Sequence, residues 1–403
     1  MNHRTVLRLL TLLIVGMLCA PVCRAEDRRI TPPPFESITE LTDDHQAALA
    51  AWLTGQLESG GYPSLSVGII TNGKLAHTVA VGTADREANR PATPDTIYRI
   101  GSITKVFTAT LMGALRDDGV VRFDDPVGKF LPQNLPGPAA ADAPVPITLQ
   151  HLACHTSGLP RLPDNRTPRP TPNGPDPYGG YTAKQLYTAL ARLKLATPPG
   201  LRASYSNLGA GLLGHALERA AGKPYESLIA EHITQPIGMA DTVITLSEDQ
   251  RARAATGSSP RDPAKPAVEW DLGVLAPAGA LASTVPDLAG FIEMQFRAID
   301  DEPGLPIAGA TLRELMQPQP RKPGDDGPHG IGWAIADHPR LGQLIWHNGG
   351  LDGFMSYMAL CPDHRTGVIV LTNRGGKGVE PLGVWLLERL TPPQATSSAP
   401  TVP

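Results

Sequence analysis

The chain has 403 residues, enough for one large domain or two lobes around a substantial core. It contains 35 Lys and Arg against 39 Asp and Glu, which gives a formal net charge of -4. Because this charge creates no basic field, nucleic acids and other polyanionic partners are disfavoured.

The first residues have the pattern of an export signal. Arg4 and Arg8 supply positive charge, and residues 9–20 form an almost unbroken apolar run. We expect cleavage after Ala25 and an exported protein, periplasmic or secreted. The apolar run is too short for a permanent transmembrane helix, and no later segment is apolar enough, so the mature chain is expected to have no membrane span.

The four cysteines fall into two groups. Cleavage would remove Cys19 and Cys23, and a lipid anchor at either of them is the minority alternative, because the residues before them fit a lipid-attachment site poorly. Cys154 and Cys361 would remain. One pair is not a disulfide framework, so two buried free thiols are expected.

Both ends of the chain are polar and rich in proline. After the signal, residues 26–40 are expected to form a flexible leader, and residues 391–403 a disordered tail. One domain is expected over residues 41–390.

Alternating or continuous apolar runs near both ends of this domain predict strands. A Thr71-Asn72-Gly73 turn between two such runs is typical of a hairpin. The predicted strands are residues 64–70, 74–80, 343–346, 354–361 and 367–372. Since clear strands occur only at the two ends, we expect one antiparallel sheet lobe built from residues 41–100 and 330–390.

The middle of the chain, residues 101–329, is expected to form a helical lobe. Apolar residues recur at helical spacing from Ser102 to a stop at Asp118-Gly119, and a second helix is predicted over residues 208–221. The proline-rich residues 159–181 between them are expected to form one wall of a cleft, with a solvated insertion as the alternative. The fold class is therefore α+β, an antiparallel sheet with flanking helices and a central helical lobe.

Three short motifs follow one another along the chain: Ser102-Ile103-Thr104-Lys105, Tyr205-Ser206-Asn207 and His347-Asn348-Gly349. On a helix, Lys105 lies one turn from Ser102, where its amine can lower the cost of forming an alkoxide. No other serine precedes a lysine by three positions. The sequence therefore predicts Ser102 as an activated nucleophile.

Other chemistries are less well supported. Residues 209–214 match the dinucleotide-binding glycine pattern, but a loop precedes them where a buried strand is needed, so helix packing on small residues is favoured. His151 and His155 lack the glutamate of a zinc-protease motif, because Leu152 occupies its place. No metal and no cofactor are expected, and residues 155–158 are interpreted as a supporting loop without chemistry.

With these motifs the chain resembles the penicillin-recognising serine hydrolases related to class C β-lactamases. That group also holds D-alanyl-D-alanine carboxypeptidases, D-amino-acid peptidases and esterases. The resemblance covers residues 40–390, and residues 149–159 and Gly330-Ile331-Gly332-Trp333 contribute to it. It implies a β-lactamase/transpeptidase-like fold.

The resemblance also implies roles for individual residues. Ser102 would attack a carbonyl and become acylated, while Lys105 and Tyr205 share the proton transfers. Tyr205 would act as a phenolate favoured by neighbouring cations. Asn207 would hydrogen-bond Lys105 and the substrate amide. The oxyanion would lie between the backbone N–H groups of Ser102 and Gly350.

His347, Asn348 and Gly349 are expected to bind substrate, in the place where much of the family has Lys-Thr-Gly. A histidine is only partly charged near neutral pH, so binding of a substrate carboxylate is expected to weaken as pH rises through the imidazole pKa. Gly349 and Gly350 are expected to leave room for a peptide-like substrate along the strand. The histidine weakens the β-lactamase assignment without changing the acyl-enzyme chemistry.

The expected function is a periplasmic serine hydrolase that acts on D-amino-acid peptides of peptidoglycan, with modest turnover of β-lactams. Its expected partner is thus a small-molecule or peptide substrate. An esterase on small acyl esters is the alternative among enzymes. A slowly deacylating penicillin-binding sensor is the alternative of another class, and the complete motifs argue against it.

Overall fold

The computed structural model describes residues 42–132, 145–320 and 329–391. The expected export signal, the leader and residues 392–403 lie outside these ranges. Within them, no helix combines the length and apolar character needed to cross a bilayer.

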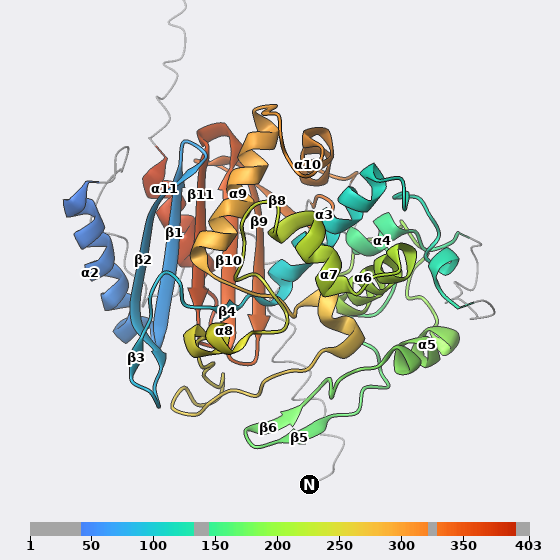
Figure 1. Ribbon diagram of the computed structural model, residues 1–403, viewed down its shortest axis with the longest axis horizontal. Helices are drawn as coiled ribbons and strands as arrows, with labels where there is room; N and C mark the ends of the chain where they lie inside the picture. Colours follow the sequence, from blue (N-terminus) through green and yellow to red (C-terminus); the bar gives the residue numbers. More distant parts are fainter. Residues whose placement is uncertain (1–41, 133–144, 321–328, 392–403) are drawn as a thin grey trace, which may run out of the picture.

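A seven-stranded antiparallel sheet fills one half of the molecule (Figure 1), in the order β3-β2-β1-β11-β10-β9-β8. Its strands are β1 (Ser64–Thr71), β2 (Lys74–Asp85), β3 (Arg90–Pro91), β8 (Ala334–His338), β9 (Gly342–Leu351), β10 (Phe354–Cys361) and β11 (Thr366–Thr372). β1 pairs with β11, so segments from the two ends of the chain meet in the middle of the sheet. The antiparallel sheet expected from the sequence is confirmed, with β3 and β8 as additional edge strands.

The predicted hairpin forms between β1 and β2. Asn72 and Gly73 both have positive φ, 53° and 73°, as a tight turn between twisted strands requires. The register closes at Thr71 opposite Lys74, with a bulge between Ile69 and Ile70. The turn chemistry of Asn-Gly therefore fixes how these two strands pair.

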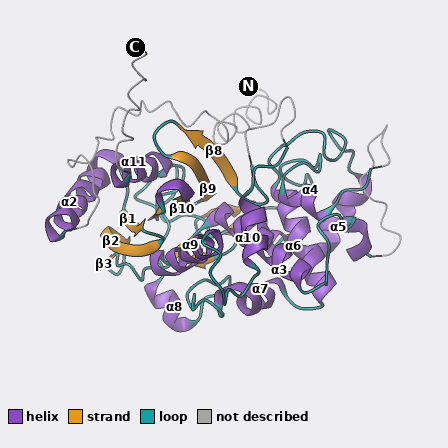
Figure 2. Ribbon diagram, turned by 90° about the horizontal axis from the view of Figure 1, so that it is seen from above, coloured by secondary structure: helices purple, strands orange, loops and turns teal. Residues whose placement is uncertain are grey.

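Helices cover both faces of the sheet (Figure 2). One face packs against α2 (Asp43–Gly60) and α11 (Glu380–Leu390), and the opposite face against α9 (Val285–Ile299). Alternate β1 residues face α2 and α11, namely Leu65, Val67 and Ile69. Because α9 lies within residues 101–329, part of the expected helical lobe belongs instead to the layer over the sheet.

The other half of the molecule is helical, with α3 (Thr104–Asp117) at its centre. The residues of α3 are buried from Thr104 to Leu115. The remaining elements between α3 and β8 include η2 (Val127–Phe130), α4 (Leu149–Ala153), β5 (Arg169–Thr171), β6 (Gly174–Asp176), α5 (Ala183–Arg192), α6 (Asn207–Ala221), α7 (Tyr225–Ile229), η3 (Ala230–Thr234), α8 (Glu248–Arg253), η4 (Gly273–Ala278) and α10 (Gly309–Met316). The expected α+β architecture is confirmed.

The glycine pattern of residues 209–214 lies on α6, where it serves packing. A Cβ at Gly211 would lie 2.5 Å from Leu275 Cδ2, and one at Gly214 would lie 2.1 Å from Pro277 Cγ. These glycines let α6 approach η4 at a distance that no larger residue allows. Small-residue packing of the helix, and not nucleotide binding, accounts for the pattern.

Cys154 and Cys361 are buried free thiols, as expected. Burial raises the pKa of each thiol to about 12. Both therefore remain protonated and behave as small apolar side chains of the core.

Candidate active site

Three side chains from two segments of the chain meet at one oxygen atom. Ser102 lies in the short turn η1 (Gly101–Ile103) that leads into α3, and Lys105 follows one turn later. Nζ of Lys105 is 2.8 Å from Oγ of Ser102. The phenol of Tyr205, which comes from the loop before α6, donates to the same Oγ at 2.7 Å. The structure thus brings together the three residues expected to be catalytic.

The first turn of this helix is anchored on both sides. β4 (Tyr98–Arg99) precedes Ser102 and pairs with β7 (Ala282–Ser283). The N–H of Ile100 donates to the carbonyl of Leu281 at 2.9 Å. Ser102 therefore follows a backbone segment held in place by hydrogen bonds to the chain beyond η4.

Burial sets the protonation of Lys105, whose exposed fraction is only 4%. Its Nζ also donates to the carbonyl oxygen of Ala278 at 2.5 Å, at the end of η4. Burial, and then the positive charge of Arg161, hold the pKa of Lys105 well below its ordinary value. The neutral amine is thereby favoured, and its lone pair can accept the proton of Ser102.

Tyr205 differs from the expected phenolate. Burial raises the pKa of Tyr205 to about 12, although the hydrogen bond to Ser102 and the charge of Arg161 act in the opposite direction. The phenol is therefore protonated near neutral pH and acts as a donor. Burial thus outweighs the expected lowering of the Tyr205 pKa by neighbouring cations, and Lys105 is the group better suited to accept the proton of Ser102.

Tyr205→Phe is expected to lower kcat by about a hundredfold with little change in KM, because it removes a proton-transfer group and keeps the ring. Steady-state kinetics on any turned-over substrate measures this. Tyr187→Phe is the matched control, since it removes a phenol that bonds His215 on α6. A Tyr205→Phe enzyme with kcat near the wild-type value would exclude Tyr205 from proton transfer.

His155 holds the tyrosine ring. The centroids of the two rings lie 4.4 Å apart, and Nδ1 of His155 accepts the N–H of Ser206 at 3.2 Å. Burial, followed by the charges of Lys105 and nearby groups, keeps the pKa of His155 well below its ordinary value, so that this nitrogen stays an acceptor. In agreement with the supporting role expected of residues 155–158, His155 therefore positions Tyr205.

Asn207 lies beside the site but does not bond Lys105. Its side chain hydrogen-bonds the phenol of Tyr178, and its Oδ1 is buried without a partner among the described residues. Lys105 instead bonds Ser102 and Ala278. The expected bond between Asn207 and Lys105 is wrong, and one buried acceptor is left available two residues after Tyr205.

β9 brings His347 to the other side of Ser102. The residue is 6% exposed, and its Nδ1 donates to the carbonyl of Asn348 at 2.6 Å. Burial, followed by the charge of Lys105, lowers the pKa of His347 to about 4. The ring is therefore neutral near pH 7, and the expected partial charge is wrong.

Because His347 protonates only near pH 4, it should contribute nothing to the pH dependence of KM between about pH 5.5 and pH 8.5. Wild type and His347→Gln should give parallel KM curves for a carboxylate-bearing peptide over this range. If KM of the wild type rose with an inflection near the usual imidazole pKa, and the variant did not follow, His347 would be a charged ligand after all.

Asn348 faces away from Ser102. Its Nδ2 donates to the carboxylate of Glu380, at the start of α11 on the opposite face of the sheet. Successive residues of a strand point to opposite faces, so His347 and Asn348 cannot both line one site. The expected side-chain contact of Asn348 with substrate is therefore wrong.

The space beside Gly349 is occupied by other atoms of the protein. A Cβ there would lie 1.9 Å from the carbonyl oxygen of Ile100 and 2.5 Å from Oγ of Ser356. The expected room for a substrate at Gly349 is therefore wrong, whereas Gly350 is exposed. A side chain at Gly349 would push β9 away from the segment that carries Ser102.

This close approach places two backbone donors near the nucleophile. A Cβ at Gly101 would lie 2.6 Å from the backbone nitrogen of Gly350. The first N–H groups of a helix lack intrahelical partners, which leaves that of Ser102 available. This close approach of the Gly101 and Gly350 backbones is what the expected oxyanion site at the N–H groups of Ser102 and Gly350 requires.

The two histidines of residues 151–155 serve separate contacts. Nδ1 of His151 accepts the N–H of Thr148 at 3.2 Å, at the start of α4, whereas His155 bonds Ser206. In the described part of the chain no three His, Cys, Asp or Glu side chains form a metal-binding group.

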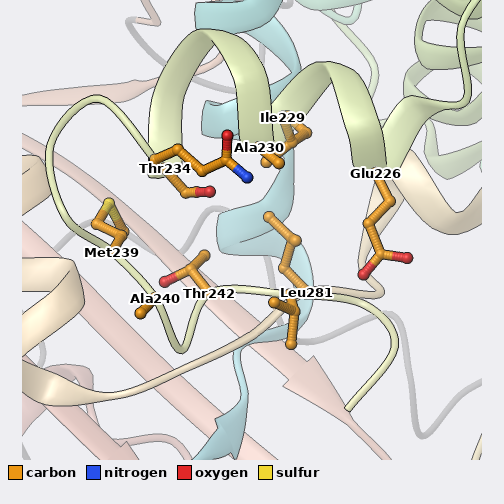
Figure 3. A pocket seen from close by; sticks show the side chains of 10 residues that line it. Glu226, Ile229, Ala230, Thr234, Met239, Ala240, Thr242 and Leu281 are labelled. Atoms are coloured by element: carbon orange, nitrogen blue, oxygen red, sulfur yellow. The ribbon is translucent and has the colours of Figure 1, made fainter. Parts of the chain in front are cut away.

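A cavity of about 280 Å³ lies away from Ser102, beside α7 and η3 (Figure 3). Its lining includes Glu226, whose Oε1 accepts the N–H groups of Ile244 and Thr245, each at 2.7 Å. The Glu226 carboxylate thus anchors the loop that contains Ile244 and Thr245. None of the side chains around Ser102 lines this cavity.

Comparisons with known proteins identify the family of the chain. A family model described as Beta-lactamase matches residues 49–391. The chain is 33% identical to the D-alanyl-D-alanine-carboxypeptidase/endopeptidase AmpH of Escherichia coli strain K12, over 70% of this chain and 71% of that protein. It is 28% identical to a beta-lactamase of Pseudomonas fluorescens, over 78% of this chain and 90% of the relative.

Solved structures share the fold. A beta-lactamase from Sulfitobacter sp. EE-36 superposes with a TM-score of 0.72 at 25% identity, covering 87% of this chain and 98% of the other. A beta-lactamase/D-alanine carboxypeptidase from Yersinia pestis gives a TM-score of 0.67 at 28% identity, covering 86% and 99%.

Proposed function

The chain belongs to the beta-lactamase family and is a serine hydrolase, and we propose that it cleaves D-alanyl-D-alanine-type peptides of peptidoglycan through an acyl-enzyme at Ser102. The observation that carries this proposal is the meeting of Lys105 Nζ and the Tyr205 hydroxyl at Ser102 Oγ. The name of the Escherichia coli relative supports the substrate class. An exported, periplasmic location is part of the proposal and rests on the sequence of the first 25 residues.

In the acylation step, Oγ of Ser102 attacks the scissile carbonyl carbon while its proton passes to the neutral amine of Lys105. The carbonyl oxygen becomes an oxyanion that accepts the N–H groups of Ser102 and Gly350. The C–N bond then breaks as Tyr205 donates its phenolic proton to the leaving amine. The proton on Lys105 then passes to the phenolate oxygen of Tyr205 and restores the phenol.

Deacylation uses the same groups in reverse. A water attacks the acyl carbon and gives its proton to the Lys105 amine, and the proton then returns to Oγ of Ser102 as the ester bond breaks. The unpartnered Oδ1 of Asn207 can accept the N–H of a peptide-like substrate and so hold its carbonyl over Ser102. No cofactor enters either step.

Esterase activity is the second candidate, and the neutral state of His347 favours it. Without a charge, His347 gives no electrostatic preference for carboxylate-bearing substrates over neutral acyl esters. The slowly deacylating sensor has no comparable support, since the Lys105 and Tyr205 groups needed for deacylation both contact Ser102.

A substrate panel on the purified protein tests the proposal. Release of D-alanine from a D-Ala-D-Ala peptide is expected at a higher kcat/KM than hydrolysis of nitrocefin or p-nitrophenyl acetate. If only the ester is turned over, the second candidate replaces the first. Stoichiometric labelling without turnover of any substrate would indicate the sensor.

A further inference from the structure

An exposed arginine lies against the catalytic tyrosine. The guanidinium carbon of Arg161 is 5.0 Å from the ring centroid of Tyr205. Among the described residues it forms no ion pair with an Asp or Glu side chain. Its neighbour in the same loop, Arg166, differs because its guanidinium donates to the carbonyls of Pro163 and Pro177.

The backbone fixes Arg161 beside the Tyr205 loop. Its carbonyl oxygen accepts the N–H groups of Asn207 at 3.0 Å and Leu208 at 3.2 Å. The preceding carbonyl, of Pro160, accepts the hydroxyl of Ser206 at 2.7 Å. Because these bonds join the two segments, the position of Arg161 relative to Tyr205 is set by the fold.

Arg161 is also the charged group that dominates this side of the site. Its positive charge lowers the pKa of Lys105 and of Tyr205, which shows that its field reaches both. Two histidines nearby, His155 and His347, are neutral near pH 7. No carboxylate is among the groups that influence the pKa of Lys105 or Tyr205. The site therefore presents one unpaired, permanent positive charge.

We propose that Arg161 binds a carboxylate of the substrate and gives the site its preference for anionic substrates, the role that the sequence analysis assigned to His347. A guanidinium suits this task, because its planar N–H groups can donate to both oxygens of a carboxylate and it stays charged at every working pH. The inference rests on the proposed function. It identifies the group that would recognise a charged peptide.

The carboxylate could belong to either side of the scissile bond, and four D-Ala-D-Ala peptides separate the two sources. One pair differs only at the C-terminus, as free acid or amide. The other pair differs only in the acyl-side cap, succinyl or acetyl. The measured quantity is the ratio of kcat/KM for the charged over the neutral member of each pair. Any general effect on Ser102 chemistry cancels in this ratio.

Arg161→Gln is expected to reduce the charged-over-neutral ratio about tenfold in one of the pairs, which corresponds to the loss of one charge-assisted interaction. Arg161→Lys should restore part of that ratio. Arg192→Gln, which removes an exposed arginine paired with Asp164, is the matched control and should leave both ratios unchanged.

If Arg161→Gln leaves both ratios at the wild-type value, Arg161 does not bind a substrate carboxylate. That result differs from failure of the proposed function, in which the wild-type enzyme would release no D-alanine from any of the four peptides. Thermal melting of each variant identifies a fold defect. If Arg161→Gln is misfolded, the charged-over-neutral ratio of Arg161→Lys decides the proposal.

Discussion

Lys105→Met is expected to lower kcat by about a thousandfold, because it removes the one amine that contacts Oγ of Ser102 in the described part of the chain and keeps the apolar stem in its buried place. KM should change little, since Lys105 bonds Ser102 and Ala278 and not the substrate. Lys129→Met is the matched control, because Lys129 is half exposed and pairs with Asp125. A Lys105→Met enzyme that retains a tenth of kcat would require another base.

The pH profile tests the same role by titration. A base works only when unprotonated, so kcat/KM should fall as pH is lowered through the pKa of Lys105. Because burial holds this pKa well below the ordinary lysine value, the fall should occur well below pH 10. Lys105→Arg should be inactive throughout, since a guanidinium stays protonated. A wild-type profile that rises only near the ordinary lysine pKa would show that Lys105 is cationic.

Short sequence motifs predicted those parts of the fold and of the site that depend on residues close together in the chain. The spacing of Ser102 and Lys105 fixes their separation on a helix, and the structure brings them to 2.8 Å. The Asn-Gly turn likewise fixed the β1–β2 hairpin. In both cases the determining interactions lie within a few residues of the chain.

The protonation states could not be predicted, because they depend on burial by distant segments. Tyr205 and His347 are each neutral since the fold removes them from water, and no local motif reports that. Asn348 is a different case. Strand alternation implies that only one of two successive residues faces the site, so its orientation toward Glu380 could have been inferred.

Arg161 was missed, and the contact of His155 with Tyr205 was not predicted, for a third reason. Each reaches Tyr205 across loops separated in sequence by more than forty residues, held by bonds between backbone and side chains. Similarly, the placement of α9 on the sheet depends on the packing of its apolar face against β1, β2 and β11. Such contacts follow from the three-dimensional arrangement and leave no spacing signal.

Ser102→Ala is expected to abolish turnover and covalent labelling together. The reason is that Ser102 carries the one hydroxyl bonded to both Lys105 and Tyr205 among the described residues. Thr108 is a useful comparison, since its hydroxyl is buried on the same helix but bonds Tyr225 and Pro277. Thr108→Val should therefore keep the capacity for labelling if it folds.

The most direct measurement of the acyl-enzyme is intact mass of the purified protein after incubation with a penicillin or a fluorophosphonate, followed by peptide mapping. One adduct per chain is expected, on the peptide that contains Ser102, and none in Ser102→Ala. An adduct that persists in Ser102→Ala, or that maps to another residue of the wild type, would contradict the assignment of Ser102 as the nucleophile.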